Sequence, residues 1–234
     1  MKKKILIFII TYRSSFRLKL ILEKIKNFKS IINYSILISD DCSDDDTIKY
    51  VPKNNKKITL NIKNKNLGYG ANIKTCFNFA IKKKFDYAVM IHGDNQYDAK
   101  YVPKLYKIIN KKKADAVTGS RMMELRSALN GKMPIYKFIG NLVLTKVFNC
   151  FFKTNFTDAH TGLWIYNVNT LKKINYQNLD SKFNFDNQLR IKFIKNNKTI
   201  LETPIKTYYR NERSSVHLLY SIKFIFDIIF HNKI

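Results

Sequence analysis

The segment from Tyr87 to Gln96, Y-A-V-M-I-H-G-D-N-Q, decides how the fold is interpreted. It begins with an apolar, β-rich run, which is typical of a strand buried on both faces in a parallel sheet. A polar turn from His92 to Gln96 follows directly. Residues 35–46, S-I-L-I-S-D-D-C-S-D-D-D, have the same pattern, a short buried strand that ends in carboxylates. Two such units predict a parallel sheet with acidic loops at the carboxyl ends of its strands.

Strands alternate with helices on both sides of these two units. The sequence predicts further strands at residues 5–10, 58–62, 116–118, 163–166 and 199–205, and helices at about 18–28, 68–84, after residue 96, at 134–152 and at 216–230. This order predicts an α/β fold in one domain, with a mostly parallel central sheet and helices on both faces. In such sheets ligands bind at the carboxyl ends of the strands, so both acidic turns are candidate sites.

The composition limits the class of protein and its partners. The chain has 234 residues, of which 45% are hydrophobic, enough for a buried core. Its 43 basic and 17 acidic residues give a net charge of +26, which favours nucleic acid, anionic lipid or a phosphorylated substrate as partner. A general bias towards Lys, Asn and Ile also explains part of this excess. Because the lysines are dispersed, a basic nucleic-acid-binding module is a remote alternative, and no nucleic-acid partner is expected.

Three further features concern the compartment. The cysteines are odd in number and lack metal-ligand spacing, which indicates free thiols in a reducing cytosol (Cys42, Cys76 and Cys150). The apolar run at residues 5–10 is short for a signal peptide, and no stretch approaches the roughly 20 apolar residues that cross a bilayer. Residues 216–230 form an amphipathic pattern, so this helix either lies at a membrane interface or packs on the core.

Asp94 is the first candidate site residue. It follows a buried strand, and the amide oxygen of Gln96 comes two residues later. Mg²⁺ and Mn²⁺ prefer such hard oxygen ligands and keep coordination positions for substrate phosphates. The alternative is an ordinary turn in which Asp94 caps the next helix.

Two other loops carry candidate residues. Asp40 and Asp41 are adjacent carboxylates, which suit a hydrogen bond to a base or ribose, whereas the later acids of the turn are explained by helix capping. In the segment Asn66-Leu67-Gly68-Tyr69-Gly70, the glycines permit a close backbone approach before a helix starts. The start of that helix could bind an anion.

The motifs occur in a recognisable order. They are Ile9-Ile10-Thr11-Tyr12, Asp40 to Thr47 for D-D-x-S-x-D-x-T, Asn66-Leu67-Gly68 for N-x-G, His92 to Gln96 for D-x-D-x-Q, Gly119-Ser120-Arg121 for G-S-R, and Asp158 to Gly162 for D-x-x-S/T-G. In this order the chain resembles the inverting family-two glycosyltransferases with a GT-A fold. It looks most like the polyprenyl-phosphate sugar synthases, the dolichol-phosphate-mannose synthase group, from Ile5 to about Phe224.

The resemblance implies an inverting hexosyltransferase that uses a UDP- or GDP-linked sugar and a divalent metal, Mg²⁺ or Mn²⁺. Asp94 and Gln96 would hold the metal, and Asp94, Asp158 and Arg121 would be the catalytic residues, with Asp158 near the reacting sugar. Arg121 would face a phosphate, and Lys137 stands where the group carries an Arg that meets the acceptor phosphate. The residues that would bind the donor are Thr11, Tyr12, Asp40, Asp41, Asn66, Gly68 and Asp94.

The chain also departs from the family pattern. Ile10 replaces the usual Pro, and Arg13-Ser14 replaces Asn-Glu, which leaves the base open. His92 replaces the first Asp of D-x-D, so the metal site has one negative charge fewer. Trp164 replaces an Arg after Asp158. His160, beside Asp158, could be a catalytic base, but a phosphate acceptor is already ionised and needs none.

The expected function is therefore transfer of a sugar to a polyprenyl phosphate at the cytoplasmic face of a membrane, by a peripheral protein that touches anionic lipid. The alternative is a glycosyltransferase with a saccharide acceptor, which works in cell-surface polysaccharide assembly. Residues 1–215 would form the catalytic domain, and residues 216–234 the amphipathic C-terminal helix. The sugar, the base and the oligomeric state stay open.

Overall fold

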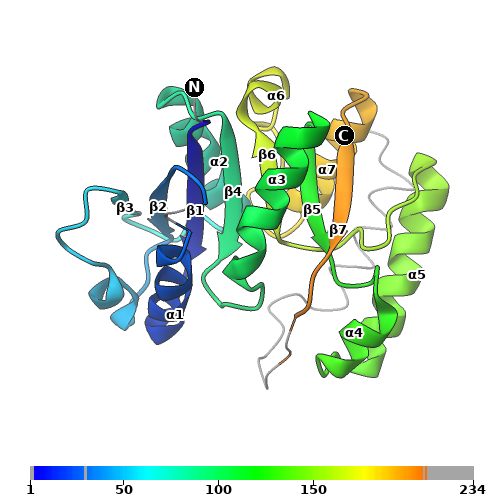
Figure 1. The fold of residues 1–234 in the computed structure, drawn as a ribbon, viewed down its shortest axis with the longest axis horizontal. Helices are drawn as coiled ribbons and strands as arrows, with labels where there is room; N and C mark the ends of the chain where they lie inside the picture. The colour runs from blue at the N-terminus through cyan, green and yellow to red at the C-terminus, as the bar shows by residue number, and fades with distance from the viewer. Residues whose placement is uncertain (1–2, 29–30, 208, 210–234) are drawn as a thin grey trace.

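The computed structural model describes residues 3–28, 31–207 and 209. A seven-stranded sheet in the order β3-β2-β1-β4-β6-β5-β7 runs through its centre (Figure 1). Strand β6 is antiparallel to β4 and β5, and the other neighbouring strands are parallel, so the predicted mostly parallel sheet is confirmed. The strands are β1 (Ile5–Thr11), β2 (Tyr34–Asp40), β3 (Ile58–Ile62), β4 (Tyr87–His92), β5 (Ala116–Ser120), β6 (Trp164–Asn167) and β7 (Ile200–Pro204).

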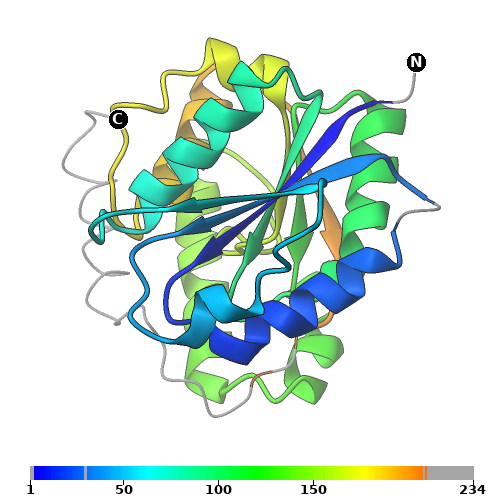
Figure 2. The same cartoon turned by 90° about the vertical axis from the view of Figure 1, so that its left-hand side faces the viewer.

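Helices cover both faces of the sheet, as Figure 2 shows for α1 and α2. Side chains alternate along β1, so Ile5, Ile7 and Ile9 pack with α1 and α3, while Leu6 and Phe8 pack with α2 and α7. The α-helices are α1 (Ser15–Lys26), α2 (Tyr69–Lys82), α3 (Val102–Lys112), α4 (Leu125–Asn130), α5 (Ile135–Phe152), α6 (Val168–Lys173) and α7 (Phe185–Lys195), and the 3-10 helices are η1 (Asp46–Tyr50) and η2 (Ala99–Tyr101).

The strand ends bring the polar loops together. In the sheet register Thr11 lies opposite Asp40, and Ile10 lies opposite His92, so β1, β2 and β4 end side by side. Three residues just beyond these ends, Arg13, Cys42 and Asn95, have positive φ angles. Such backbone conformations are uncommon outside Gly and gather at functional sites. This edge of the sheet is therefore where chemistry is expected.

Parts of the sequence-based assignment differ from the structure. Helices α6 and α7 are not among the predicted elements, although α7 packs directly on the core beside α2. The predicted helix at residues 216–230 and the domain boundary after residue 215 lie outside the described residues. In the part of the chain that the structure describes, no helix is both long and apolar enough to cross a bilayer.

Two helical glycines give a test of this packing. A Cβ on Gly70 would overlap the carbonyl oxygen of Asp180 and come within 2.8 Å of Cβ of Phe185, whereas a Cβ on Gly140 would meet no atom within 4 Å. We expect Gly70→Ala to lower the free energy of unfolding by ~1–3 kcal/mol through overpacking. Gly140→Ala should raise it by ~1 kcal/mol, because Ala is the better helix former. Urea denaturation measures both; equal effects would contradict the close approach of residues 180–185 to α2.

Candidate active site

The first part of the site is the acidic turn after β2. Asp40 is fully buried, and its carboxylate accepts hydrogen bonds from Oγ1 of Thr11 at 2.8 Å and from the backbone N–H of Ser43 at 2.8 Å. Asp41 accepts from the backbone N–H groups of Leu67, at 3.0 Å, and Gly68, at 2.8 Å. The pair thus ties the turn after β2 and the loop at residues 66–68 to the strand ends. A contact of either carboxylate with a nucleoside stays a prediction.

The glycine segment after β3 has the positive φ angle and the close backbone approach that the sequence predicted. Gly68 has φ of 94°, and its N–H is taken by Asp41 and by the side chain of Asn66 at 3.1 Å. In the first turn of α2, the backbone N–H of Ala71 donates to the carbonyl of Ser181 at 3.1 Å. The loop at residues 180–182 therefore packs against this helix start, and anion binding there stays a prediction.

The turn after β4 holds Asp94 and Gln96. Oδ1 of Asp94 accepts the backbone N–H of Gln96 at 2.9 Å, and within the described residues Oδ2 accepts no hydrogen bond. No group of three or more His, Cys, Asp and Glu side chains converges on one point in the described part of the chain. One carboxylate beside an amide oxygen nevertheless fits Mg²⁺ or Mn²⁺, which commonly bind through one or two carboxylates and substrate phosphates. The residues present therefore fit the implied metal.

The imidazole of His92, which precedes this turn, contacts Tyr69 and Gly162. Its Nε2 lies 3.1 Å from the hydroxyl of Tyr69, and that hydroxyl donates to Oδ2 of Asp186 at 2.5 Å. Burial raises the pKa of both Tyr69 and Asp186. Gly162 lies against the imidazole, since a Cβ there would come within 2.7 Å of Nε2. This arrangement fixes the ring at the end of β4, where the family pattern has a carboxylate.

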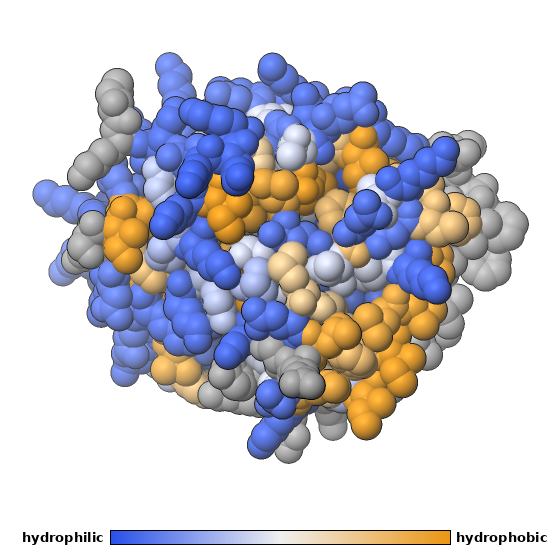
Figure 3. Space-filling view, turned by 45° about the vertical axis from the view of Figure 1, so that its right-hand side comes forward, coloured by the Kyte–Doolittle hydropathy of each residue, from blue (hydrophilic) through white to orange (hydrophobic). Residues whose placement is uncertain are grey.

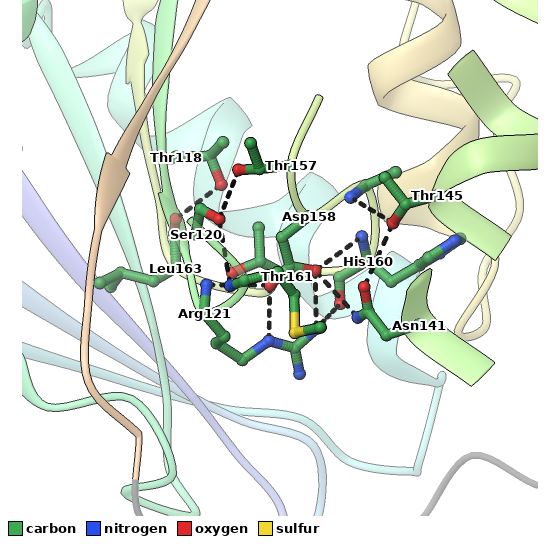
Figure 4. A network of polar contacts seen from close by, with 12 residues as sticks. Thr118, Ser120, Arg121, Asn141, Thr145, Thr157, Asp158, His160, Thr161 and Leu163 are labelled. Atoms are coloured by element: carbon green, nitrogen blue, oxygen red, sulfur yellow. Dashed lines mark hydrogen bonds and ion pairs between the residues drawn. The ribbon is translucent and has the colours of Figure 1, made fainter. Parts of the chain in front are cut away.

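Arg121 and Asp158 form a buried ion pair (Figure 4). Nε of Arg121 donates to Oδ2 of Asp158 at 2.7 Å, and Nη2 donates to Oδ1 at 2.8 Å. The backbone N–H of Arg121 and Nδ2 of Asn141 donate to the same carboxylate, at 3.1 and 3.0 Å. Asp158 thereby joins the end of β5, helix α5 and the loop that leads to β6.

The charge states follow from this geometry. Burial alone would raise the pKa of Asp158, but the charge and hydrogen bonds of Arg121 outweigh it and lower that pKa. Two further N–H groups of Arg121 bond to the carbonyl of His160 and, at 3.1 Å, to the hydroxyl of Tyr209. Both predicted roles, Asp158 at the sugar and Arg121 at a phosphate, stay predictions. The contacts favour a positioning role for the pair, because its polar groups are already engaged.

Lys137 also contacts Tyr209. Its Nζ is 5.7 Å from the centre of the Tyr209 ring, while Arg121 bonds to the hydroxyl of that ring. The structure thus brings together the two cations that we expected at the acceptor phosphate. It does so through Tyr209, which the sequence did not single out.

His160 provides a prediction about pH. Burial lowers the pKa of His160 to about 4, so its ring is neutral at pH 7. Below its unfolded pKa of ~6.5, the unfolded chain takes up a proton that the folded chain does not. The free energy of unfolding should therefore fall between about pH 6.5 and 4, by roughly 3 kcal/mol from this group alone.

Denaturation curves of the wild type and His160→Gln at pH 7 and pH 4.5 measure this contribution. The loss of stability on acidification should be smaller in the variant. Comparison with the variant separates this effect from that of Asp186, whose raised pKa acts in the opposite direction. The same acid dependence in both proteins would contradict a buried neutral imidazole.

Two residues near this site were missed in the sequence. Asp186 contacts Tyr69, and Arg190 lies between the rings of Phe156 and Trp164, with its Cζ 4.7 and 4.3 Å from their centres. Burial lowers the pKa of Arg190 to about 10. The sequence did contain a signal for both residues. Asp186 and Arg190 stand four residues apart among apolar residues, and this spacing puts them on one face of a helix.

Comparison with known proteins gives the following relatives. The profile of the family described as glycosyl transferase family 2 matches residues 6–175. An uncharacterised protein of Methanocaldococcus jannaschii is 29% identical over 213 residues, which cover 90% of this chain and 86% of that protein. The UDP-N-acetylglucosamine–dolichyl-phosphate N-acetylglucosaminyltransferase of Methanococcus voltae is 27% identical over 206 residues, covering 82% of this chain and 81% of the relative.

Solved structures share the fold. Glucosyl-3-phosphoglycerate synthase from Mycobacterium tuberculosis, in complex with Mn²⁺, uridine diphosphate and glucosyl-3-phosphoglycerate, superimposes with a TM-score of 0.66 at 12% identity, over 97% of this chain and 77% of that chain. A mannosyltransferase from Pyrobaculum calidifontis, in complex with GDP-mannose and Mn²⁺, gives 0.63 at 12% identity, over 92% of this chain and 59% of that chain.

Proposed function

Because the chain belongs to glycosyl transferase family 2, we propose that it transfers a sugar from a UDP- or GDP-linked donor to a polyprenyl phosphate, with a divalent metal as cofactor. The observation that carries this proposal is the common edge formed by the ends of β1, β2 and β4, where one carboxylate oxygen of Asp94 accepts no hydrogen bond from the described residues. Relatives of this fold bind Mn²⁺ together with UDP or GDP-mannose, which supports the metal and the donor class.

The donor would lie along this edge. We assign the nucleoside to the side of Thr11, Tyr12 and the acidic turn, and the diphosphate to the side of Asp94 and Gln96. Asn66 and Gly68 would act through Asp41, which holds their loop in place. A bound Mg²⁺ or Mn²⁺ would supply positive charge for the departing diphosphate.

Nucleotide binding gives a direct test of this assignment. Asp41→Ala removes the acceptor of two backbone N–H groups and is expected to weaken UDP or GDP binding by roughly 1.5–3 kcal/mol, as for a lost charged hydrogen bond. Titration calorimetry measures the change. Asp46→Ala, in the same turn but with an exposed carboxylate paired to Lys49, is the matched control and should bind like the wild type. Unchanged binding in Asp41→Ala would make the Asp40–Asp41 pair structural.

The transfer step is a substitution at the anomeric carbon. An oxygen of the acceptor phosphate forms a bond to this carbon as the bond to the donor diphosphate breaks, and the nucleoside diphosphate leaves with the electron pair. The acceptor is ionised at neutral pH, so the step needs positioning rather than a base. This fits the engaged carboxylate of Asp158 and the low pKa of His160. Attack from the face opposite the leaving group would invert the configuration.

The acceptor phosphate is assigned to the surroundings of Tyr209. Lys137 lies over this ring and Arg121 donates to its hydroxyl, and the relative from Methanococcus voltae is named for a dolichyl-phosphate acceptor. With Arg121 engaged by Asp158, Lys137 is the cation with fewer competing partners. The peripheral, cytoplasmic location expected from the sequence agrees with an acceptor of this kind.

Competition between acceptors tests the acceptor class. Purified protein is given a labelled UDP- or GDP-sugar with either a short polyprenyl phosphate or a water-soluble oligosaccharide. We expect label in the lipid fraction, strongly reduced in Lys137→Ala although donor binding is unchanged. Transfer to the oligosaccharide alone would instead support the saccharide acceptor and cell-surface polysaccharide assembly.

A further inference from the structure

Helix α5 turns its polar side inwards. Asn141 bonds to Asp158 in the ion-pair network, and Oγ1 of Thr145 accepts the backbone N–H of Ala159 at 3.2 Å. Both side chains are buried, at 9% and 5% exposed, and Phe148 completes this inner side. The polar stripe of the helix therefore faces the core, where its side chains bond to Asp158 and to the backbone next to it.

The opposite side of α5 is apolar and exposed. Ile135 is 71% exposed, and Ile139 and Val143 are each 54% exposed. At ~100° per residue these side chains lie within an arc of roughly 80° and face away from Asn141 and Thr145. A helix on the surface of a water-soluble protein normally has the reverse arrangement.

Helix α4 extends this apolar surface. Leu125 and Leu129 are about half exposed, and α4 and α5 lie together at the end of the molecule beyond β7 (Figure 1). Figure 3, which brings this end forward, shows apolar side chains gathered there. The outer α4–α5 face is formed by Leu125, Leu129, Ile135, Ile139, Leu142 and Val143.

The charges around this face are mostly positive, although the exposed Glu124 precedes Leu125. No Asp or Glu occurs between Glu124 and Asp158, whereas the same stretch has five basic residues. The side chains of Lys132, Lys146 and Lys153 are exposed. An apolar surface with an excess of cations matches an anionic lipid headgroup layer over acyl chains. It matches a second copy of the chain poorly, because two such faces would bring like charges together.

We propose that the outer α4–α5 face docks on an anionic membrane surface. The inference rests on the proposed function and deepens it. The inner side of the same helix contacts the Arg121–Asp158 pair, and Lys137 starts its polar stripe near Tyr209. A membrane on the outer face would therefore place its lipid headgroups beside the helix that has Lys137 in its first turn.

Vesicle flotation tests the docking surface with the full chain. The vesicles consist of phosphatidylcholine with phosphatidylglycerol, and flotation of the wild type should weaken at high salt. Ile135→Glu and Ile139→Glu place a carboxylate in the face and should each lower partitioning by roughly tenfold or more. Ile31→Glu is the matched control, because Ile31 is 61% exposed and lies far from α5 in the turn before β2. It should float like the wild type.

Three results would overturn the docking surface. The wild type does not float; Ile135→Glu and Ile139→Glu float as well as the wild type; or these variants only convert a dimer to a monomer in sedimentation. Transfer to a short, water-soluble polyprenyl phosphate is measured in parallel, without vesicles. Both variants should keep this activity. Its absence in the wild type contradicts the proposed function, whatever the flotation result.

Discussion

Replacing Asp158 by Asn is expected to lower the free energy of unfolding by about 3–5 kcal/mol, because it leaves the buried guanidinium of Arg121 without its counter-charge. Asn has nearly the same shape as Asp, so the loss comes from charge and not from a cavity. Asp158 is 0% exposed and Arg121 is 8% exposed, so water cannot replace the missing partner. Urea denaturation at pH 7 measures the change.

The exposed pair Arg13–Asp44 is the matched control. It is also held by two hydrogen bonds, from Nε and Nη2 of Arg13, but both side chains are more than half exposed. Asp44→Asn should leave the stability unchanged within error, because solvent screens such pairs. The double variant Arg121→Met with Asp158→Leu should recover much of the loss. If Asp158→Asn is as stable as the wild type, the ion pair does not hold β5, α5 and the loop at residues 157–162 together.

Replacing Asp94 by Asn is expected to reduce turnover roughly a thousandfold, which corresponds to a loss of about 4 kcal/mol in the transition state. The amide oxygen introduced by Asp94→Asn would still accept the N–H of Gln96, so the turn keeps its hydrogen bond and only the negative charge is lost. Donor-dependent Mn²⁺ binding, followed by electron paramagnetic resonance, should weaken in parallel. This second readout does not depend on turnover.

Asp98 lies four residues further along the same loop and gives the control. Its carboxylate caps η2 and contacts Lys24, so it has a structural explanation. Asp98→Asn should keep both Mn²⁺ binding and turnover. Full activity in Asp94→Asn would remove Asp94 from the metal site and would leave the acidic edge without its proposed role.

The strands could be predicted because each one is an apolar run that ends in a polar loop. Strands β1, β2 and β4 therefore appear in the sequence close to their observed bounds, and so does the edge with Asp40 and Asp94. Helix α7 was missed because buried polar residues interrupt its apolar repeat. Phe185, Leu189 and Phe193 form this repeat, but the half-buried Asp186 and the buried Arg190 lie beside them.

The roles of the polar residues were harder to predict. A sequence indicates that Asn141 and Thr145 share one side of a helix, but not that this side faces the core. Here the buried carboxylate of Asp158 determines which side of the helix faces the core. Leaving this carboxylate without hydrogen-bond donors would cost more free energy than leaving apolar helix residues exposed. In the same way, the pairing of Arg121 with Asp158 joins residues distant in sequence and depends on the loop between α5 and β6.

The central claim is that the acidic edge binds a nucleotide-sugar and activates its diphosphate as a leaving group for transfer to a lipid phosphate. Its most direct test measures release of UDP or GDP from a panel of nucleotide-sugars, with Mn²⁺ and a short polyprenyl phosphate present. We predict release that requires both the metal and the acceptor and that yields one glycosyl phospholipid per nucleotide. Nucleotide release from none of the donors, or release that continues unchanged in Asp94→Asn, would contradict this account.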